Sequence, residues 1–383
     1  MNLRKLVYST IIGLGVTALC ACGGSDSSEP IIPPVTGGSA LQNLLDSTVG
    51  QDVPGLILSV QGDDIDFIGS AGIADLEAHT AMQTYYQMPA GSAGKKATAL
   101  LVAMLHHEGL LNIEDKIANY LPNSILDNIP YSQEITIRQL LNHSAGVHDY
   151  LDEDTSPAWF EDGQNSIGTL KSDIDALEYI YNKPAYFAPG ESVHYSNSHY
   201  LLAGLILDSV LGEHHHTALR NRVFIPLGMN NTYYSGFEND LGESIPGYIL
   251  LDGEMVNTKP FYASLGVADA PLVTTVNDLS TLLRAIVQED SVVPEEVQEL
   301  LIGEDSIIDT PYSMDFGLGV FSEIVEGHHV YHHGGDEAGY KTMNLHIVDS
   351  NTTITLFANC NGYEACVVKV DNLMQNVLAE AMQ

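Results

Sequence analysis

Apolar and polar residues alternate near both ends of the chain. Residues 53–60 and 65–69 form two short apolar runs joined by the polar turn 62–64, and this pattern predicts a β-hairpin. Strand-like runs return late in the chain, at residues 330–333, 340–348 and 352–357. We therefore expect both ends of the chain to contribute strands.

The middle of the chain follows a helical period instead. In residues 97–105, apolar side chains recur three and four positions apart, which is typical of a helix that packs on one face. Similar patterns cover residues 135–142, 200–211 and 276–288. With strands at both ends, these helices predict an α/β (α+β) fold, in which an antiparallel sheet built from both chain ends is flanked by helices and carries a helical insertion at roughly 96–290.

The N-terminal residues show neither pattern. Arg4 and Lys5 precede a short apolar run, which is the layout of a secretory signal peptide. The run closes with Leu-Cys-Ala-Cys, which is similar to a bacterial lipobox and predicts a signal peptide at 1–21 with a lipid on Cys22. The alternative is an ordinary secretory signal with incidental cysteines.

A stretch rich in Gly, Ser and Pro follows the predicted signal peptide. Residues 22–40 lack periodicity and predict a flexible tether, so that residues 41–383 form the folded domain. An exported lipoprotein of this kind is expected on the outer membrane, facing the periplasm or the cell exterior.

Acidic residues dominate the charge of the chain. Its 50 Asp and Glu against 14 Lys and Arg give a formal net charge of −36, which repels nucleic acids and anionic membrane surfaces. We therefore expect no nucleic-acid partner, and contact with a membrane only through the lipid anchor. Because basic residues are scarce, each lysine is informative.

Two cysteines lie near the C-terminus. Cys360 and Cys366 form an even pair in a chain predicted to be exported, and this favours a disulfide. Two free buried thiols are the alternative, since spacing alone does not show whether the side chains face one another.

The sequence Gly91–Lys96, GSAGKK, holds a candidate nucleophile. If a helix starts near Ser92, Lys95 shares the helix face of the serine, whereas Lys96 points about 100° further around. A lysine with a lowered pKa can act as the base that a serine hydroxyl needs. Lys96 is expected to solvate the helix mouth or to offset the local field. The alternative for the whole motif is an N-cap serine with a solvated lysine.

Two later motifs carry further candidates. Tyr195 and Asn197 are two residues apart in a predicted loop, so both can face one pocket; a buried tyrosine with an N-cap asparagine is the alternative. His333 and Gly335 follow a late strand, where glycine lets a substrate lie along the sheet edge.

These motifs resemble those of the penicillin-recognising serine hydrolases, the family of class C β-lactamases, DD-peptidases, D-aminopeptidases and related esterases. The family pattern is Ser-x-x-Lys, then Tyr-x-Asn, then Lys-Thr-Gly or His-x-Gly, and the chain has all three in this order. Three supporting stretches are also similar to family segments: ITIRQLLNHSAGVHDY, APGESVHYSNSHYLLAGLIL and FIPLGMNNTYY. The resemblance covers nearly everything from Leu41 onward and implies a β-lactamase/transpeptidase-like fold.

The resemblance also implies roles for the motif residues. Ser92 would be acylated, and Lys95 with Tyr195 would move protons. Asn197 would hold the acyl-side carbonyl of a small-molecule or peptide substrate. The third side of the pocket would be lined by His333 and Gly335, and the oxyanion hole would use the N–H groups of Ser92 and Asp336. No cofactor is expected.

The third motif sets the expected substrate. Because it is His-Gly-Gly, not Lys-Thr-Gly, D-amino-acid peptides or esters are favoured over β-lactams. An Asp336 side chain facing the pocket would repel an anionic substrate; alternatively, it turns outward and leaves only its N–H in the site. A penicillin- or muropeptide-binding lipoprotein without turnover is the alternative to an enzyme.

Histidine runs at 214–216 and 328–329, together with His332, suggest metal binding. The chain has no His-Glu-x-x-His and no cysteine–histidine zinc spacing. These histidines are therefore expected on the surface, with no metal site.

Overall fold

The computed structural model describes residues 37–382. The predicted signal peptide, the lipidation of Cys22 and most of the predicted tether lie outside the described residues. Where a tether to residue 40 was expected, helix α1 (Gly37–Thr48) already begins at Gly37. The helix starts this early because Leu41 and Leu45, one turn apart, are fully buried in a core.

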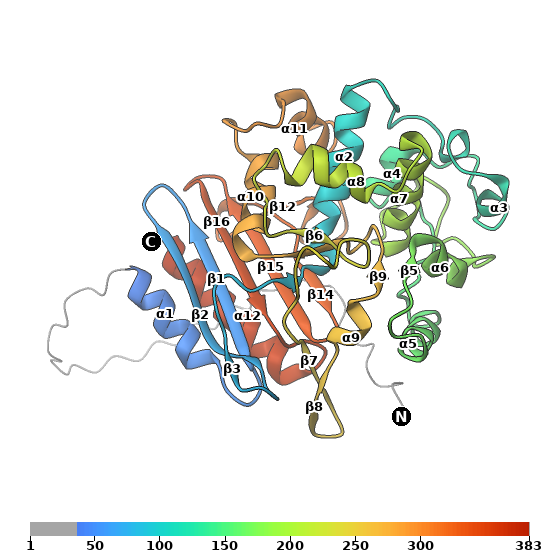
Figure 1. Ribbon diagram of the computed structural model, residues 1–383. Coiled ribbons are helices and arrows are strands. Elements are labelled where there is room, and N and C mark those ends of the chain that lie inside the picture. Colours follow the sequence, from blue (N-terminus) through green and yellow to red (C-terminus); the bar gives the residue numbers. More distant parts are fainter. Residues whose placement is uncertain (1–36, 383) are drawn as a thin grey trace, which may run out of the picture.

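Strands from the two chain ends meet in the middle of one antiparallel sheet (Figure 1). Strand β1 (Gly55–Gln61) pairs with β16 (Thr352–Ala358) on one side and with β2 (Asp66–Asp75) on the other. The predicted α/β (α+β) fold with a sheet built from both ends is confirmed. The sheet order is β11-β12-β13-β15-β16-β1-β2-β3, and β14 also pairs with β15. The remaining strands of this sheet are β3 (Thr80–Ala81), β11 (Asp315–Phe316), β12 (Phe321–Val325), β13 (His328–His332), β14 (Gly335–Glu337) and β15 (Tyr340–Ile347).

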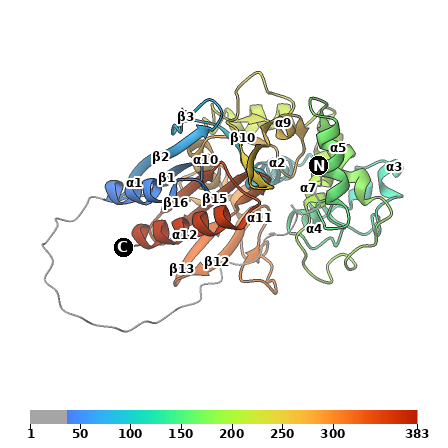
Figure 2. The ribbon, with the colours of Figure 1, turned by 90° about the horizontal axis from the view of Figure 1, so that it is seen from below.

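Alternation along the strands separates two cores. Leu56 and Leu58 of β1 face α1 and α12 (Glu364–Ala381), while Ile57 faces the opposite side, where the helical region packs. Figure 2 shows α1 and α12 together on one face of the sheet and the helical region to one side. The sheet is thus covered on both faces.

Helices are the main regular elements between β4 and the late strands, as expected. They are α2 (Lys95–His107), α3 (Asn123–Leu126), α4 (Ile137–Leu141), α5 (Ser156–Asn165), α6 (Asp173–Leu177), α7 (Asn197–Leu211), α8 (His216–Ala218), α9 (Lys259–Tyr262), α10 (Val276–Val287) and α11 (Glu295–Ile302). Short strands interrupt them: β4 (Met88–Pro89), β5 (Lys171–Ser172), β6 (Tyr233–Tyr234), β7 (Tyr248–Leu251), β8 (Glu254–Asn257), β9 (Leu265–Gly266) and β10 (Leu272–Thr274).

Two further features bear on the sequence predictions. Cys360 and Cys366 form a disulfide between the end of β16 and the first turn of α12, so the favoured pairing is confirmed. Within residues 37–382, no helix has the length and apolar character needed to cross a membrane.

Candidate active site

Ser92 lies in a short 3₁₀ turn, Gly91–Gly94, that leads directly into α2. Gly91 has a φ of +55°, a conformation that favours glycine. A Cβ on Gly91 would lie 3.3 Å from the backbone nitrogen of Asp336, and a Cβ on Gly335 would lie 3.0 Å from that of Ser92. These glycines let β14 lie against the serine turn, so the two N–H groups proposed for an oxyanion hole are near one another.

Lys95 is the first residue of α2 and is fully buried. Its Nζ lies 3.0 Å from Ser92 Oγ, 2.7 Å from Asn197 Oδ1 and 2.9 Å from the carbonyl oxygen of Asp269. Burial lowers the pKa of Lys95, although nearby carboxylates, chiefly Asp269, oppose the shift. A neutral amine fits these contacts, because its two N–H groups can donate to the carbonyl oxygens while its lone pair accepts from the serine.

Lys96 was expected to be solvated, and this expectation is wrong. The side chain is fully buried, and its Nζ donates to the carbonyl oxygen of His333 at 2.9 Å. Burial alone holds the pKa of Lys96 well below its ordinary value. The 100° rotation from Lys95 does separate the two lysines, but it directs Lys96 toward the backbone of His333 in the third motif instead of toward water.

Tyr195 approaches the same serine from the loop before α7. Its ring stacks on His143, with ring centroids 4.3 Å apart, and lies 5.2 Å from Lys95 Nζ. Its hydroxyl is buried and makes no hydrogen bond of normal geometry within residues 37–382. Burial raises the pKa of Tyr195 well above its ordinary value, and the proximity of the Ser92 hydroxyl opposes this in part. Tyr195 is therefore a neutral phenol directed at the reacting group.

Asn197 begins α7 and is held on both sides. Its Oδ1 accepts from Lys95, and its Nδ2 donates to Asp149 Oδ2 at 3.0 Å. Burial raises the pKa of Asp149 to about 6, although the backbone N–H of Leu151 opposes this shift. The amide thus fixes the position of the Lys95 amine and connects it to a buried carboxyl group.

Asp269 supplies a second buried carboxyl group beside Lys95. Its Oδ2 lies 3.8 Å from Lys95 Nζ, and the hydroxyl of Tyr150 donates to both carboxylate oxygens at 3.2 and 3.3 Å. Burial raises the pKa of Asp269, and the Lys95 charge opposes this. Sequence reasoning missed Asp269 because no motif marks it in the linear sequence.

The third motif closes the site from the sheet edge. His333 is buried and stacks on Phe321, with ring centroids 4.3 Å apart, and its Nε2 has no hydrogen-bond partner in the described part of the chain. Burial holds the pKa of His333 well below its ordinary value, so the ring is neutral. Gly335 begins β14 and lies against Ala90 and Ser92, as a residue lining the site should.

The side chain of Asp336 does not face the pocket. It is half-exposed, and its Oδ1 accepts from Lys341 Nζ and from Asn361 Nδ2, both at 3.1 Å. The alternative, in which Asp336 turns outward, is therefore correct. Residues alternate sides along a strand, so the next side chain, Glu337, faces inward, where its Cγ lies 3.2 Å from the position that a Cβ on Gly91 would take.

The other histidines of these runs are half-buried, but His215 is not. It is fully buried, with Nδ1 2.8 Å from Asp208 Oδ1 and Nε2 2.8 Å from Tyr234 Oη, so its expected surface position is wrong. Asp173, His214 and His215 hold donor atoms within 4.8 Å of one another. Since both ring nitrogens of His215 already have protein partners, we assign no metal to this group.

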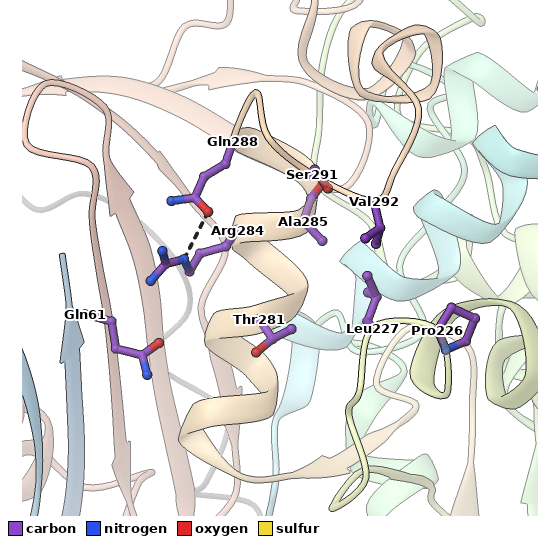
Figure 3. Close-up of a pocket in the computed structure, with 9 residues that line it drawn as sticks. All are labelled: Gln61, Pro226, Leu227, Thr281, Arg284, Ala285, Gln288, Ser291 and Val292. Carbon is purple, nitrogen blue, oxygen red and sulfur yellow. Dashed lines mark hydrogen bonds between the residues drawn. The ribbon is translucent and has the colours of Figure 1, made fainter. Parts of the chain in front are cut away.

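A pocket of about 320 Å³ lies away from these residues (Figure 3). Gln61 of β1, Thr281 and Arg284 of α10, and the turn at 226–227 line it. In Figure 3 the guanidinium group of Arg284 is directed to Gln288. None of the motif residues lines this pocket, and we assign it no function.

The structure pairs Ser92 with Lys95 as the spacing predicted, and it brings both together with Tyr195 and Asn197 as the family resemblance implied. Asp149 and Tyr150 were missed, although both lie in the quoted stretch ITIRQLLNHSAGVHDY, whose similarity to the family was the available signal. The positions of Lys96 behind the third motif and of Glu337 beside Gly91 could be found only from the tertiary structure.

The chain matches a known family over most of its length. A family model described as beta-lactamase matches residues 41–378. Penicillin-binding protein 4* of Bacillus subtilis (strain 168) is 27% identical over 336 residues, which cover 82% of this chain and 70% of that protein. Protein flp of Staphylococcus aureus (strain N315) is 24% identical over 310 residues, and the match covers 81% of this chain but only 60% of flp.

Solved structures with a similar fold include two hydrolases. A D-stereospecific amidohydrolase from a Streptomyces species has a TM-score of 0.71 at 23% identity, covering 87% of this chain and 98% of that one. The D-amino acid amidase of Ochrobactrum anthropi SV3, complexed with D-phenylalanine, has a TM-score of 0.75 at 18% identity, covering 90% and 99% of the two chains.

Proposed function

Because the chain belongs to the beta-lactamase family and is a serine hydrolase, we propose that it hydrolyses amide or ester bonds of D-amino-acid derivatives through an acyl-enzyme at Ser92. The observation that carries the proposal is the direct contact between Ser92 Oγ and the buried amine of Lys95. Similar folds in a D-amino acid amidase and a D-stereospecific amidohydrolase support the substrate class.

Acylation begins with proton transfer from Ser92. The Lys95 amine, whose pKa is lowered by burial, accepts the hydroxyl proton as Oγ attacks the substrate carbonyl carbon. The backbone N–H groups of Ser92 and Asp336 stabilise the resulting oxyanion. Collapse of the tetrahedral intermediate breaks the bond to the amine or alcohol, which leaves with a proton supplied by way of the Tyr195 hydroxyl.

Deacylation uses the same groups in the reverse order. Water attacks the ester carbonyl and gives a proton to the Lys95 amine, directly or by way of the Tyr195 hydroxyl, and Ser92 regains its hydroxyl proton as the D-amino acid leaves. Asn197 holds the Lys95 amine in place throughout, because its Oδ1 already accepts from Nζ. Direct binding of the substrate carbonyl by the Asn197 amide would require it to leave Asp149.

The alternative is a penicillin- or muropeptide-binding protein that is acylated without turnover. The two functions differ in the number of product molecules per protein molecule. We expect many equivalents of p-nitrophenol from a p-nitrophenyl ester and steady release of ammonia from D-phenylalanine amide, both lost in Ser92→Ala. A single stoichiometric burst would favour the binding protein and contradict the proposal.

Export, the lipid on Cys22 and an outer-membrane location remain proposals. The Cys360–Cys366 disulfide supports an oxidising compartment.

A further inference from the structure

The site holds more carboxyl groups than cations. Asp149, Asp269 and Glu337 all act on the charge of Lys95, the lysine in contact with Ser92. Burial lowers the pKa of Lys96, the next residue, and so disfavours its charged form. A substrate that brings a positive charge would balance this surplus, whereas an anionic substrate would add to it.

Glu337 differs from the other two acids in having free acceptor capacity. Asp149 accepts from Asn197 and from the N–H of Leu151, and Asp269 accepts from Tyr150 on both oxygens. For Glu337 the hydroxyl of Tyr262 is the hydrogen-bond partner, and no ion pair to Glu337 occurs within residues 37–382. An ionised carboxylate can accept about four hydrogen bonds, so most of this capacity is unused.

Glu337 is also well placed. It is half-buried, and its Cγ lies beside Gly91, the residue before the nucleophile. It follows Asp336, whose N–H belongs to the proposed oxyanion hole. A substrate whose carbonyl oxygen lies in that hole would have the atoms next to its carbonyl carbon near the Glu337 side chain.

We propose that the Glu337 carboxylate binds the free α-ammonium group of the substrate. This inference rests on the proposed function and makes it more specific: the substrate class is D-amino-acid amides or esters with an unblocked amino group. Peptides blocked at that amino group would be poor substrates.

The proposal predicts a distinctive pH dependence. Burial, with the nearby Asp269 charge, raises the pKa of Glu337 to about 8, while Tyr262 and Lys95 oppose the shift and Asp336 adds to it. Below pH 8 the empty site therefore holds a protonated carboxyl group, and an ammonium group gains its partner only as the pH rises. Above about pH 8 the substrate α-amino group loses its charge. The preference for a free amine is thus expected to be greatest near pH 8.

The test compares D-phenylalanine amide with its N-acetyl derivative. We expect Glu337→Gln to lower the ratio of the two kcat/KM values by about tenfold or more and to flatten its rise between pH 6 and 8. Titration of Lys95 changes the kcat/KM of both substrates by the same factor, so it leaves the ratio of the two values unchanged. The matched control is Glu254→Gln, which makes the same substitution at an exposed side chain of β8, away from the residues of the site, and which is expected to keep the ratio.

An unchanged ratio in Glu337→Gln, or an equal loss in Glu254→Gln, would overturn the inference. Ester hydrolysis that disappears in Ser92→Ala shows separately that the proposed function holds. Calorimetric binding of D-phenylalanine amide to Ser92→Ala provides a measurement that needs no turnover. There, adding Glu337→Gln is expected to weaken Kd about tenfold, and equal Kd values would contradict the proposal.

Discussion

At the scale of single residues, two adjacent lysines have different chemistry because of what surrounds them. Lys95 is buried among carbonyl oxygens and carboxyl groups, which oppose the effect of burial on its pKa, so that the amine can be protonated and deprotonated in turn. Lys96 is buried with the carbonyl oxygen of His333 as its partner and without a carboxylate to oppose the effect of burial. One lysine is suited to proton transfer and the other to holding the third motif against α2.

Lys96→Met is expected to stabilise the protein at pH 7. The unfolded chain carries a protonated Lys96 at this pH, and burial lowers the pKa of Lys96 in the folded chain, so burying this side chain costs free energy. This cost falls as the pH rises toward the ordinary lysine pKa of 10.5. The lost hydrogen bond to His333 is worth only about 1 kcal/mol. We therefore expect a higher Tm at pH 7 and a smaller difference from wild type at pH 10.

Lys95→Met is the matched variant for comparing the roles of the two lysines in the reaction of Ser92. It should abolish labelling by a fluorophosphonate probe, whereas Lys96→Met should retain most of it. Equal loss of labelling in both variants, or a lower Tm of Lys96→Met at every pH, would contradict the assigned environments.

The residue scale also shows what spacing reveals. Ser92 and Lys95 could be paired from the sequence because three residues make nearly one helical turn. The burial of Lys96 could not be predicted from the sequence, since periodicity gives the direction of a side chain but not what surrounds it. Asp336 and Glu337 could not be told apart either, because both are acidic and the phase of a three-residue strand is not visible in the sequence.

At the scale of elements, clear apolar periods were read correctly, and elements without such a period were missed. β15, β16 and α10 lie within one or two residues of their predicted ranges, because long apolar periods leave few alternatives. The hairpin of β7 and β8 inside the helical insertion was missed, since only four residues form each strand. α1 was hidden by the glycines and serines of its first turn.

The disulfide connects two elements of the core that covers one sheet face. The loop between Cys360 and Cys366 is short, so its closure is expected to contribute about 2 kcal/mol to the free energy of unfolding. Replacing both residues by alanine should therefore lower the urea midpoint measurably. Wild type treated with a reductant should match the double variant, and the double variant should not respond to the reductant. An unchanged midpoint after either treatment would show that the bridge does not stabilise the fold.

At the scale of the whole molecule, the site lies where the two parts of the fold meet. Ser92 and Lys95 come from the 3₁₀ turn and the first residue of α2, Asn197 from α7 in the helical insertion, and Gly335 from β14 of the sheet. The architecture could be predicted from strands at both chain ends. The contact between Asp269 and Lys95 could not be predicted, because it depends on how the insertion folds back onto α2.

The acyl-enzyme at Ser92 can be observed directly by mass spectrometry. Wild type is mixed with a p-nitrophenyl ester, quenched in acid within the first turnovers, and measured intact and after digestion. We expect a mass increase equal to the acyl group, carried by the peptide that contains Ser92 and lost in Ser92→Ala. Hydrolysis of the ester without any mass increase, or an acyl group on another residue, would contradict the proposed mechanism.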